Sequence, residues 1–136
     1  MQFSARMVRA IFATMALVVF SACGTDDIVD IRYEPQVLNA TDDFSFQAVG
    51  FLDITQTSSY TWQNTGTIAK VDRSSLVTLD SGTLTIIDAN GTQVYSAALT
   101  CCGTVETSAG TAGSWTIRVA LTNSSGTAKF RVQRGG

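Results

Sequence analysis

The sequence predicts an all-β domain, built as an antiparallel β-sandwich of jelly-roll or immunoglobulin-like type with seven to eight strands. Three observations support this fold class. Short segments alternate between apolar and polar residues with the period of two that half-buried strands show. Residues typical of turns recur between those segments. Beyond residue 22, no window has the 3.6-residue apolar period of an amphipathic helix.

The first half of the domain contains four strand candidates. Residues 44–48 read Phe-Ser-Phe-Gln-Ala and residues 60–63 read Tyr-Thr-Trp-Gln, so large apolar side chains alternate with polar ones in both. Residues 67–72 and 76–79 are two further candidates. We expect each of the four to form a separate short strand.

The second half of the domain is expected to form two hairpins. Residues 83–87 and 93–100 flank Asn90-Gly91, two residues that tolerate positive φ and favour a tight hairpin turn. Residues 114–122 and 127–133 flank the segment 123–126, which reads Asn-Ser-Ser-Gly. This segment predicts a second hairpin at the end of the chain.

The core is expected to contain the large apolar side chains that share one phase of their strands, filling an interior about 10 Å thick between two sheets. These residues are Phe44, Phe46, Trp62, Leu84, Ile86, Trp115, Ile117, Val119, Leu121, Ala128, Phe130 and Val132.

Residues 1–22 have the pattern of an export signal. Arg6 and Arg9 give a basic start, residues 10–20 form an apolar middle, and small residues precede Cys23. The apolar stretch is about half of the roughly 20 residues that a transmembrane helix needs. We therefore expect a signal peptide that is removed.

The sequence Phe20-Ser21-Ala22-Cys23 resembles the lipobox of bacterial lipoproteins, with Phe20 where leucine is commoner. The resemblance implies cleavage before Cys23, a diacylglycerol on the Cys23 sulfur, and an acyl chain such as palmitate on the new amino terminus. Gly24 stands where inner-membrane lipoproteins have a retention aspartate, which implies an outer-membrane location facing the periplasm or the cell surface.

This resemblance divides the chain into a signal peptide (1–22), a lipidated tether (23–40) and a β-sandwich domain (41–136). The tether is polar and contains the single proline of the chain, which favours flexible coil. Residues 29–33 could instead form a short edge strand, and the sequence leaves these alternatives open.

A second resemblance concerns the C-terminal part. Residues 112–119 (AGSWTIRV), followed by Ser125-Gly126-Thr127 and Phe130-Arg131-Val132, resemble the ending of P-domain and pre-peptidase C-terminal modules. Residues 84–91 (LTIIDANG) are similar to a hairpin of several exported sandwich domains. These resemblances imply a jelly-roll-like sandwich, and they imply no activity.

Composition argues against several functions. Without the two arginines of the signal, seven basic side chains remain against eleven acidic ones, a formal charge of −4. Nucleic-acid recognition needs a basic surface, so we expect no nucleic-acid partner. The chain has no histidine, the commonest general base and metal ligand, and no nucleophile-elbow or phosphate-loop motif. We therefore expect that it is not an enzyme and needs no cofactor.

Cys101 and Cys102 are adjacent, so if Cys23 carries lipid they cannot form a long-range disulfide within the chain. They could form a vicinal disulfide. Such a bridge would be easily reduced, because neighbouring Cα atoms are 3.8 Å apart and bridged cysteines usually stand 4.4–6.8 Å apart. They could also bind a soft metal, although two thiolates are fewer than the four ligands of structural zinc. The third alternative is two small residues at a strand end.

Aspartates are frequent in the predicted turns. They form no EF-hand calcium motif, so we expect them to be turn and capping residues and predict no metal site. The residues are Asp42, Asp43, Asp53, Asp72, Asp80 and Asp88.

A candidate ligand-binding face follows from the second hairpin. If residues 123–126 close it symmetrically, Arg118 lies opposite Arg131 and near Lys129 on the outward face. Like charges in such a position are destabilising unless a carboxylate of a third strand or an anionic ligand compensates them. Tyr95 is out of phase with Val94, which predicts an exposed ring that could contact a sugar.

These observations predict a non-catalytic lipoprotein of the cell envelope, with a structural or binding β-sandwich. Two alternatives stay open: an accessory module that binds a glycan or a protein through the Arg118/Arg131 face or the loop 104–113, and a thiol-redox element at Cys101 and Cys102. The expected partners are the membrane, through the lipid, and an envelope protein or glycan.

Overall fold

The computed structural model describes residues 33–74 and 78–136. The predicted signal peptide, Cys23 and the first part of the predicted tether lie outside these residues. Of the strand candidate 76–79, residues 76 and 77 also lie outside them, and residues 78 and 79 are not in a strand. Within the described ranges the chain is all-β and forms no helix, so no helix there could cross a membrane.

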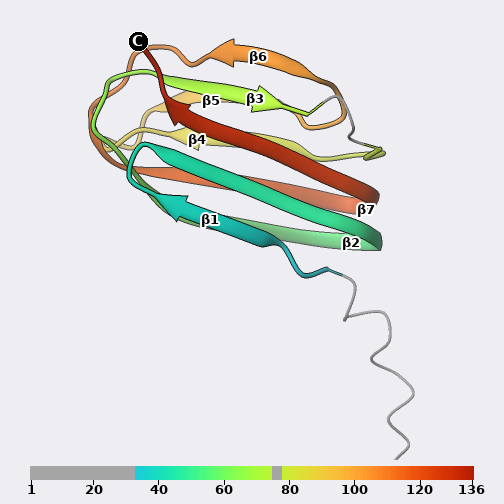
Figure 1. The fold of residues 1–136 in the computed structure, drawn as a ribbon. Coiled ribbons are helices and arrows are strands. Elements are labelled where there is room, and N and C mark those ends of the chain that lie inside the picture. Colours follow the sequence, from blue (N-terminus) through green and yellow to red (C-terminus); the bar gives the residue numbers. More distant parts are fainter. Residues whose placement is uncertain (1–32, 75–77) are drawn as a thin grey trace, which may run out of the picture.

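Seven antiparallel strands form one continuous sheet in the described residues (Figure 1). They are β1 (Gln36–Ala40), β2 (Asp43–Asn64), β3 (Ala69–Arg73), β4 (Thr83–Ile87), β5 (Gln93–Ala98), β6 (Gly103–Glu106) and β7 (Gly113–Arg134). The main path through the sheet is β1-β2-β7-β3-β6, and β4 pairs with both β7 and β5.

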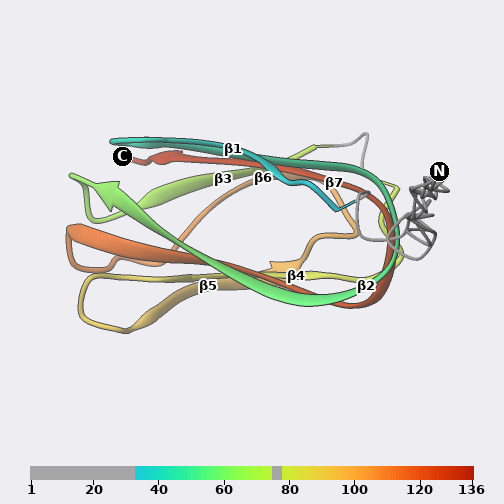
Figure 2. The ribbon, with the colours of Figure 1, turned by 90° about the horizontal axis from the view of Figure 1, so that it is seen from below.

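Strands β2 and β7 organise the fold. Each has 22 residues, and they pair with each other from one end to the other. Their register shifts three times between Ala48 and Gln56, where both strands bend (Figure 2). The sheet therefore folds over itself into two layers. One layer contains β1, β3, β6 and residues 43–48 and 128–134 of the long strands; the other contains β4, β5 and residues 56–64 and 113–121.

The predicted hairpin at residues 123–126 is wrong, because this segment is the bend of the single strand β7. Asn123 and Gly126 have the positive φ angles that the sequence suggests, 43° and 127°, but they kink one strand instead of reversing it. A Cβ atom on Gly126 would lie 2.3 Å from the carbonyl oxygen of Thr78, so glycine is also required for close approach. The strand candidates 44–48 and 60–63 are likewise two parts of the single strand β2.

Other predicted elements are confirmed. The hairpin around Asn90-Gly91 joins β4 to β5, and the candidate 67–72 corresponds to β3. The structure corrects the tether boundary, because its last residues form β1. The sequence also predicts no strand at β6 (Gly103–Glu106), which overlaps the start of the expected loop 104–113. Of the alternative strand 29–33 only Tyr33 is described, and it is not in a strand.

All twelve predicted core residues are buried, each with at most 2% of its surface exposed. Phe130 stacks on Phe46 with ring centroids 5.0 Å apart and on Phe44 at 6.1 Å. Phe51 joins the core from the bend of β2, where the edge of the Tyr33 ring packs on it. The interior is thus filled from both layers and closed at the bend by aromatic side chains.

Candidate functional site

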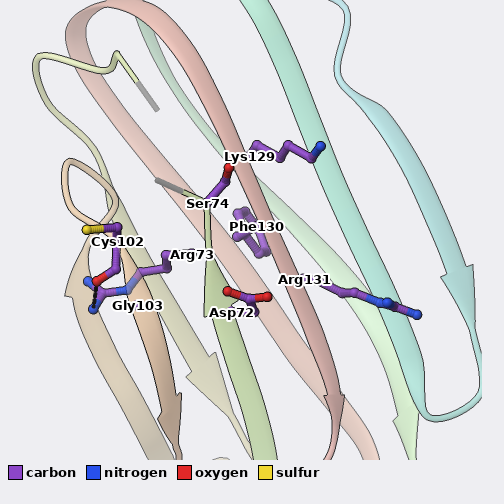
Figure 3. Close-up of a pocket in the computed structure, with 8 residues that line it drawn as sticks. All are labelled: Asp72, Arg73, Ser74, Cys102, Gly103, Lys129, Phe130 and Arg131. Atoms are coloured by element: carbon purple, nitrogen blue, oxygen red, sulfur yellow. Dashed lines mark hydrogen bonds between the residues drawn. The ribbon is translucent and has the colours of Figure 1, made fainter. Parts of the chain in front are cut away.

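A cleft of about 490 Å³ opens on β3 and β7 in the layer that contains β1 (Figure 3). This volume is in the range of small-molecule sites. Its lining is rich in charge: Arg73, Lys129 and Arg131 are basic, and Asp72 is acidic. The remaining lining residues are Ser74, Cys102, Gly103 and Phe130.

The basic side chains of the cleft point in two directions. Figure 3 shows Arg73 directed toward Cys102 and Gly103, whereas Lys129 and Arg131 extend over the neighbouring strand β2. The alternation of β7 explains this arrangement, because Lys129 and Arg131 flank the buried Phe130 and therefore share the outward face. The outward face thus carries two neighbouring cations.

Arg131 is held in place by Asp43 of β2. Its Nε donates to Asp43 Oδ1 at 2.9 Å and its Nη2 donates to Oδ2 at 2.6 Å, which is a bidentate pair. These hydrogen bonds lower the pKa of Asp43 and raise that of Arg131. A guanidinium has five N–H donors. Asp43 takes two of them, so Arg131 keeps donors for a ligand.

Arg131 also lines a second hollow, of about 540 Å³, on its other side. There it meets residues of β1 and β2, among them Asn39 and Ser45, and the exposed side chain of Leu38. Arg131 is therefore the common wall of two neighbouring hollows on one sheet face. A long ligand lying across the strands could contact both.

Lys129 is exposed, and no carboxylate within the described ranges forms an ion pair with it. Its neighbour on β2 is Gln47, which carries no charge. Asp72 pairs with Arg131 across β7 and β3 and accepts a hydrogen bond of 3.4 Å from Thr104. The surface around Lys129 is thus locally positive on a chain whose formal charge is −2.

The structure separates Arg118 from this face. Arg118 lies in the other layer, between Ser59 of β2 and Thr85 of β4, and its Nε is 3.5 Å from the Ser59 hydroxyl. The prediction that Arg118 lies opposite Arg131 is wrong because it depended on the hairpin at 123–126. A carboxylate from a neighbouring strand does compensate Arg131, as one alternative required. Asp43 forms the bidentate pair, and the charge of Asp72, the register neighbour of Arg131 on β3, also raises the pKa of Arg131.

The structure also removes Tyr95 from the exposed face. A β-bulge interrupts the β4–β5 pairing between Ile86 and Ile87, so the alternation with Val94 does not hold there. Tyr95 pairs with the buried Ile86 and is half-buried against the core. Its hydroxyl is buried without a hydrogen-bond partner in the described residues, and this burial raises the pKa of Tyr95.

Cys101 and Cys102 are free, exposed thiols in the connection between β5 and β6, with their Sγ atoms 3.5 Å apart. Arg73 ties this connection to β3: Nη1 donates to the Ala98 carbonyl at 2.8 Å and Nη2 to the Cys102 carbonyl at 3.4 Å. Among the described side chains, no three of the metal-ligating types are grouped around these thiols or elsewhere.

Several aspartates act as caps of turns, as the sequence predicts. The Asp88 carboxylate accepts hydrogen bonds from the backbone N–H groups of Thr92, Thr111 and Asn90 at 2.8, 2.8 and 3.0 Å, and these bonds lower the pKa of Asp88. Asp80 accepts from the N–H of Ser125 in the bend of β7.

No protein-family model matches the chain, and no curated protein matches its sequence. The fold and the geometry of the site define the described part of the chain as an all-β domain with a charged cleft on one sheet face.

Proposed function

We propose that this chain is the precursor of a lipid-anchored protein of the bacterial cell envelope, and that its β-domain acts by binding rather than by catalysis. The export pattern of residues 1–22 and the lipobox-like residues around Cys23 support the anchor. The same residues favour the outer membrane, because Gly24 lacks the retention aspartate.

The finer fold proposal is a β-sandwich related to P-domain and pre-peptidase C-terminal modules. The folded-over sheet and its two-layer core are consistent with a sandwich, and the support for the relationship is the resemblance of residues 112–119 and 84–91. Such modules are accessory domains, which agrees with a binding role.

The proposed ligand is an anionic envelope glycan that carries carboxylate or phosphate groups. The observation that carries this proposal is the position of Arg131, which lines two hollows and is oriented by Asp43. Two residues away, Lys129 forms no ion pair with any carboxylate of the described part of the chain. A bidentate guanidinium suits carboxylates and phosphates, and Lys129 adds a point charge. Extended polysaccharides would lie across the polar side chains between the two hollows.

Binding of the full chain to polygalacturonate, with neutral dextran as the comparison, tests the ligand class. The double variant Lys129→Gln/Arg131→Gln should weaken binding at least about tenfold, because charge-assisted hydrogen bonds contribute about 1.5–3 kcal/mol each. Arg118→Gln is the matched control, since it removes an exposed arginine of the other layer and should leave affinity unchanged. Equal losses in both variants, or equal binding of dextran, would contradict the proposal.

The anchor is tested separately in bacterial cells that express the full chain. Labelled palmitate should be incorporated into the wild-type protein and not into Cys23→Ser, and the wild-type protein should fractionate with the membranes. A soluble mature product with an unmodified Cys23 thiol would contradict the anchor and would leave the glycan proposal standing.

A further inference from the structure

The adjacent thiols Cys101 and Cys102 are arranged for chemistry that the glycan-binding face does not use. Their Sγ atoms are 3.5 Å apart, so the second sulfur is within reach of whatever bonds to the first. Both side chains are exposed, in a connection that a protein or small molecule can approach. Gly103, the first residue of β6, follows with a φ of 114°, a left-handed conformation that favours glycine.

The surroundings distinguish the two thiols. A hydrogen bond from the Cys102 backbone lowers the pKa of Cys101, and the Cys102 side chain and the positive charge of Arg73 contribute in the same direction. Arg73 is fixed beside the pair by its bonds to the Ala98 and Cys102 carbonyls. Because the thiolate is the nucleophilic form of cysteine, this lowered pKa favours Cys101 as the attacking group.

We propose that Cys101 and Cys102 form a dithiol site that exchanges with disulfide substrates, with Cys101 as the attacking thiol and Cys102 as the resolving thiol. The Cys101 thiolate attacks one sulfur of the substrate disulfide, whose S–S bond breaks, and the other sulfur leaves as a thiolate that takes up a proton. Cys102 then loses its proton and attacks Cys101, which releases the second substrate thiol. Two protein thiols are thus oxidised to one disulfide, and one substrate disulfide is reduced to two thiols.

The oxidised state should be easy to reverse. Adjacent Cα atoms are 3.8 Å apart, which is shorter than the 4.4–6.8 Å that bridged cysteines prefer, and strained disulfides are reduced readily. The site therefore suits reversible exchange better than permanent cross-linking. The location of the dithiol site in an oxidising compartment rests on the proposed export of the chain. The exchange chemistry itself does not depend on glycan binding.

The test uses the reduced full chain with Cys23→Ser in every variant, the wild-type pair included, because Cys23 would otherwise be a third reactive thiol. The protein is freed of reductant and incubated with glutathione disulfide, followed by intact-mass measurement and peptide mapping. The wild-type protein should lose the mass of two hydrogen atoms in the peptide that contains residues 101 and 102, and dithiothreitol should restore the original mass. Cys102→Ser should accumulate a glutathione adduct on Cys101, because the resolving thiol is missing.

Cys101→Ser distinguishes the assigned roles. The remaining thiol, Cys102, should react severalfold more slowly with glutathione disulfide at pH 7 than Cys101 does in Cys102→Ser. Wild-type protein that stops at the glutathione adduct, forms covalent dimers or fails to react would overturn the proposal, and so would equal rates of the two variants at pH 7. None of these measurements involves glycan binding, so the two proposals can fail independently.

Discussion

Trp62 of β2 and Trp115 of β7 are directly opposite each other in the long strand pair, with ring centroids 6.0 Å apart and ring planes at 89°. Both indoles are fully buried, and both N–H groups are satisfied: Trp62 donates to the Ala40 carbonyl at 3.0 Å and Trp115 to the Thr111 carbonyl at 2.7 Å. This edge-to-face pair joins the two long strands at the far end from their bend.

Trp115→Ala should therefore lower the free energy of unfolding by about 3–5 kcal/mol, because it leaves a large cavity in a closely packed core. Urea unfolding followed by circular dichroism measures the change. Tyr60→Ala is the comparison, since Tyr60 is only partly buried and should cost less. A loss below about 1 kcal/mol for Trp115→Ala would contradict the position of the ring in the core.

Gly126 and Gly91 give a matched pair of glycine substitutions. Both have positive φ, 127° and 83°, but a Cβ on Gly91 would meet nothing within 4 Å, whereas one on Gly126 would clash with Thr78. Gly91→Ala should cost about 1–2 kcal/mol, from backbone strain alone. Gly126→Ala should cost clearly more, because the bend must shift. Thermal unfolding of both variants measures the difference, and equal losses would contradict the close approach at the bend.

Stability should fall in acid through the capping aspartates. The folded-state pKa of Asp88 is lowered by its backbone hydrogen bonds, so the unfolded chain takes up this proton first as the pH falls. Its contribution is present above the unfolded pKa, about 3.9, and is lost as the pH drops through the lower folded value. Asp88→Asn should flatten the pH dependence of unfolding below about pH 4. Identical profiles for Asp88→Asn and the wild-type protein would contradict this role.

The Asp43–Arg131 pair makes a prediction about binding. Asp43→Asn removes the carboxylate that orients Arg131, so the guanidinium loses its fixed position while its charge remains. Affinity for polygalacturonate should fall less than in Arg131→Gln, and its dependence on salt concentration should become steeper, because a neutralising charge is removed. Titrations at several salt concentrations measure both effects. Tighter binding with an unchanged salt dependence would show that orientation of Arg131 by Asp43 is unimportant.

The sequence predicts the core well because burial follows a local signal. Each of the twelve predicted residues occupies one phase of its predicted segment. That phase holds within each segment, although along β7 it changes from odd to even positions across the bend. The turn at Asn90-Gly91 is also predictable from a local signal, because glycine tolerates positive φ. Gly91 has a φ of 83° in the connection 88–92 between β4 and β5.

The bends at β2 and β7 could not be read from the sequence. Asn123 and Gly126 signal positive φ, which a hairpin turn and a kinked strand both use, and only the pairing with residues 51–54 of β2 decides between them. The hairpin expected at 123–126 also places Arg118 on the same face as Arg131, whereas Arg118 lies in the other layer beside β4. Asp43 was not identified as the partner of Arg131 because their contact joins residues 88 positions apart in the chain.

The edge strands β1 and β6 could not be predicted from the sequence for a different reason. Four of the five residues of β1 and all four of β6 are exposed, so these strands have no buried phase to produce an alternating pattern. At Tyr95 the alternation of buried and exposed residues is present in the sequence. The β-bulge in the β4–β5 pairing shifts it, so Tyr95 faces the core. Pairing with neighbouring strands, rather than the local sequence, determines where β1, β6 and Tyr95 lie.

Because β2 and β7 each pass through both layers, neither layer is complete until β7 has joined the sheet. Residues that pair across β2 and β7 are separated by roughly 50 to 90 positions, so the decisive contacts form late in synthesis. A nascent chain that lacks residues 113–134 has no partner for most of β2, and it should stay unfolded while the earlier residues emerge. Under the proposed export, such a chain would meet a membrane translocation channel in the extended form that threading requires.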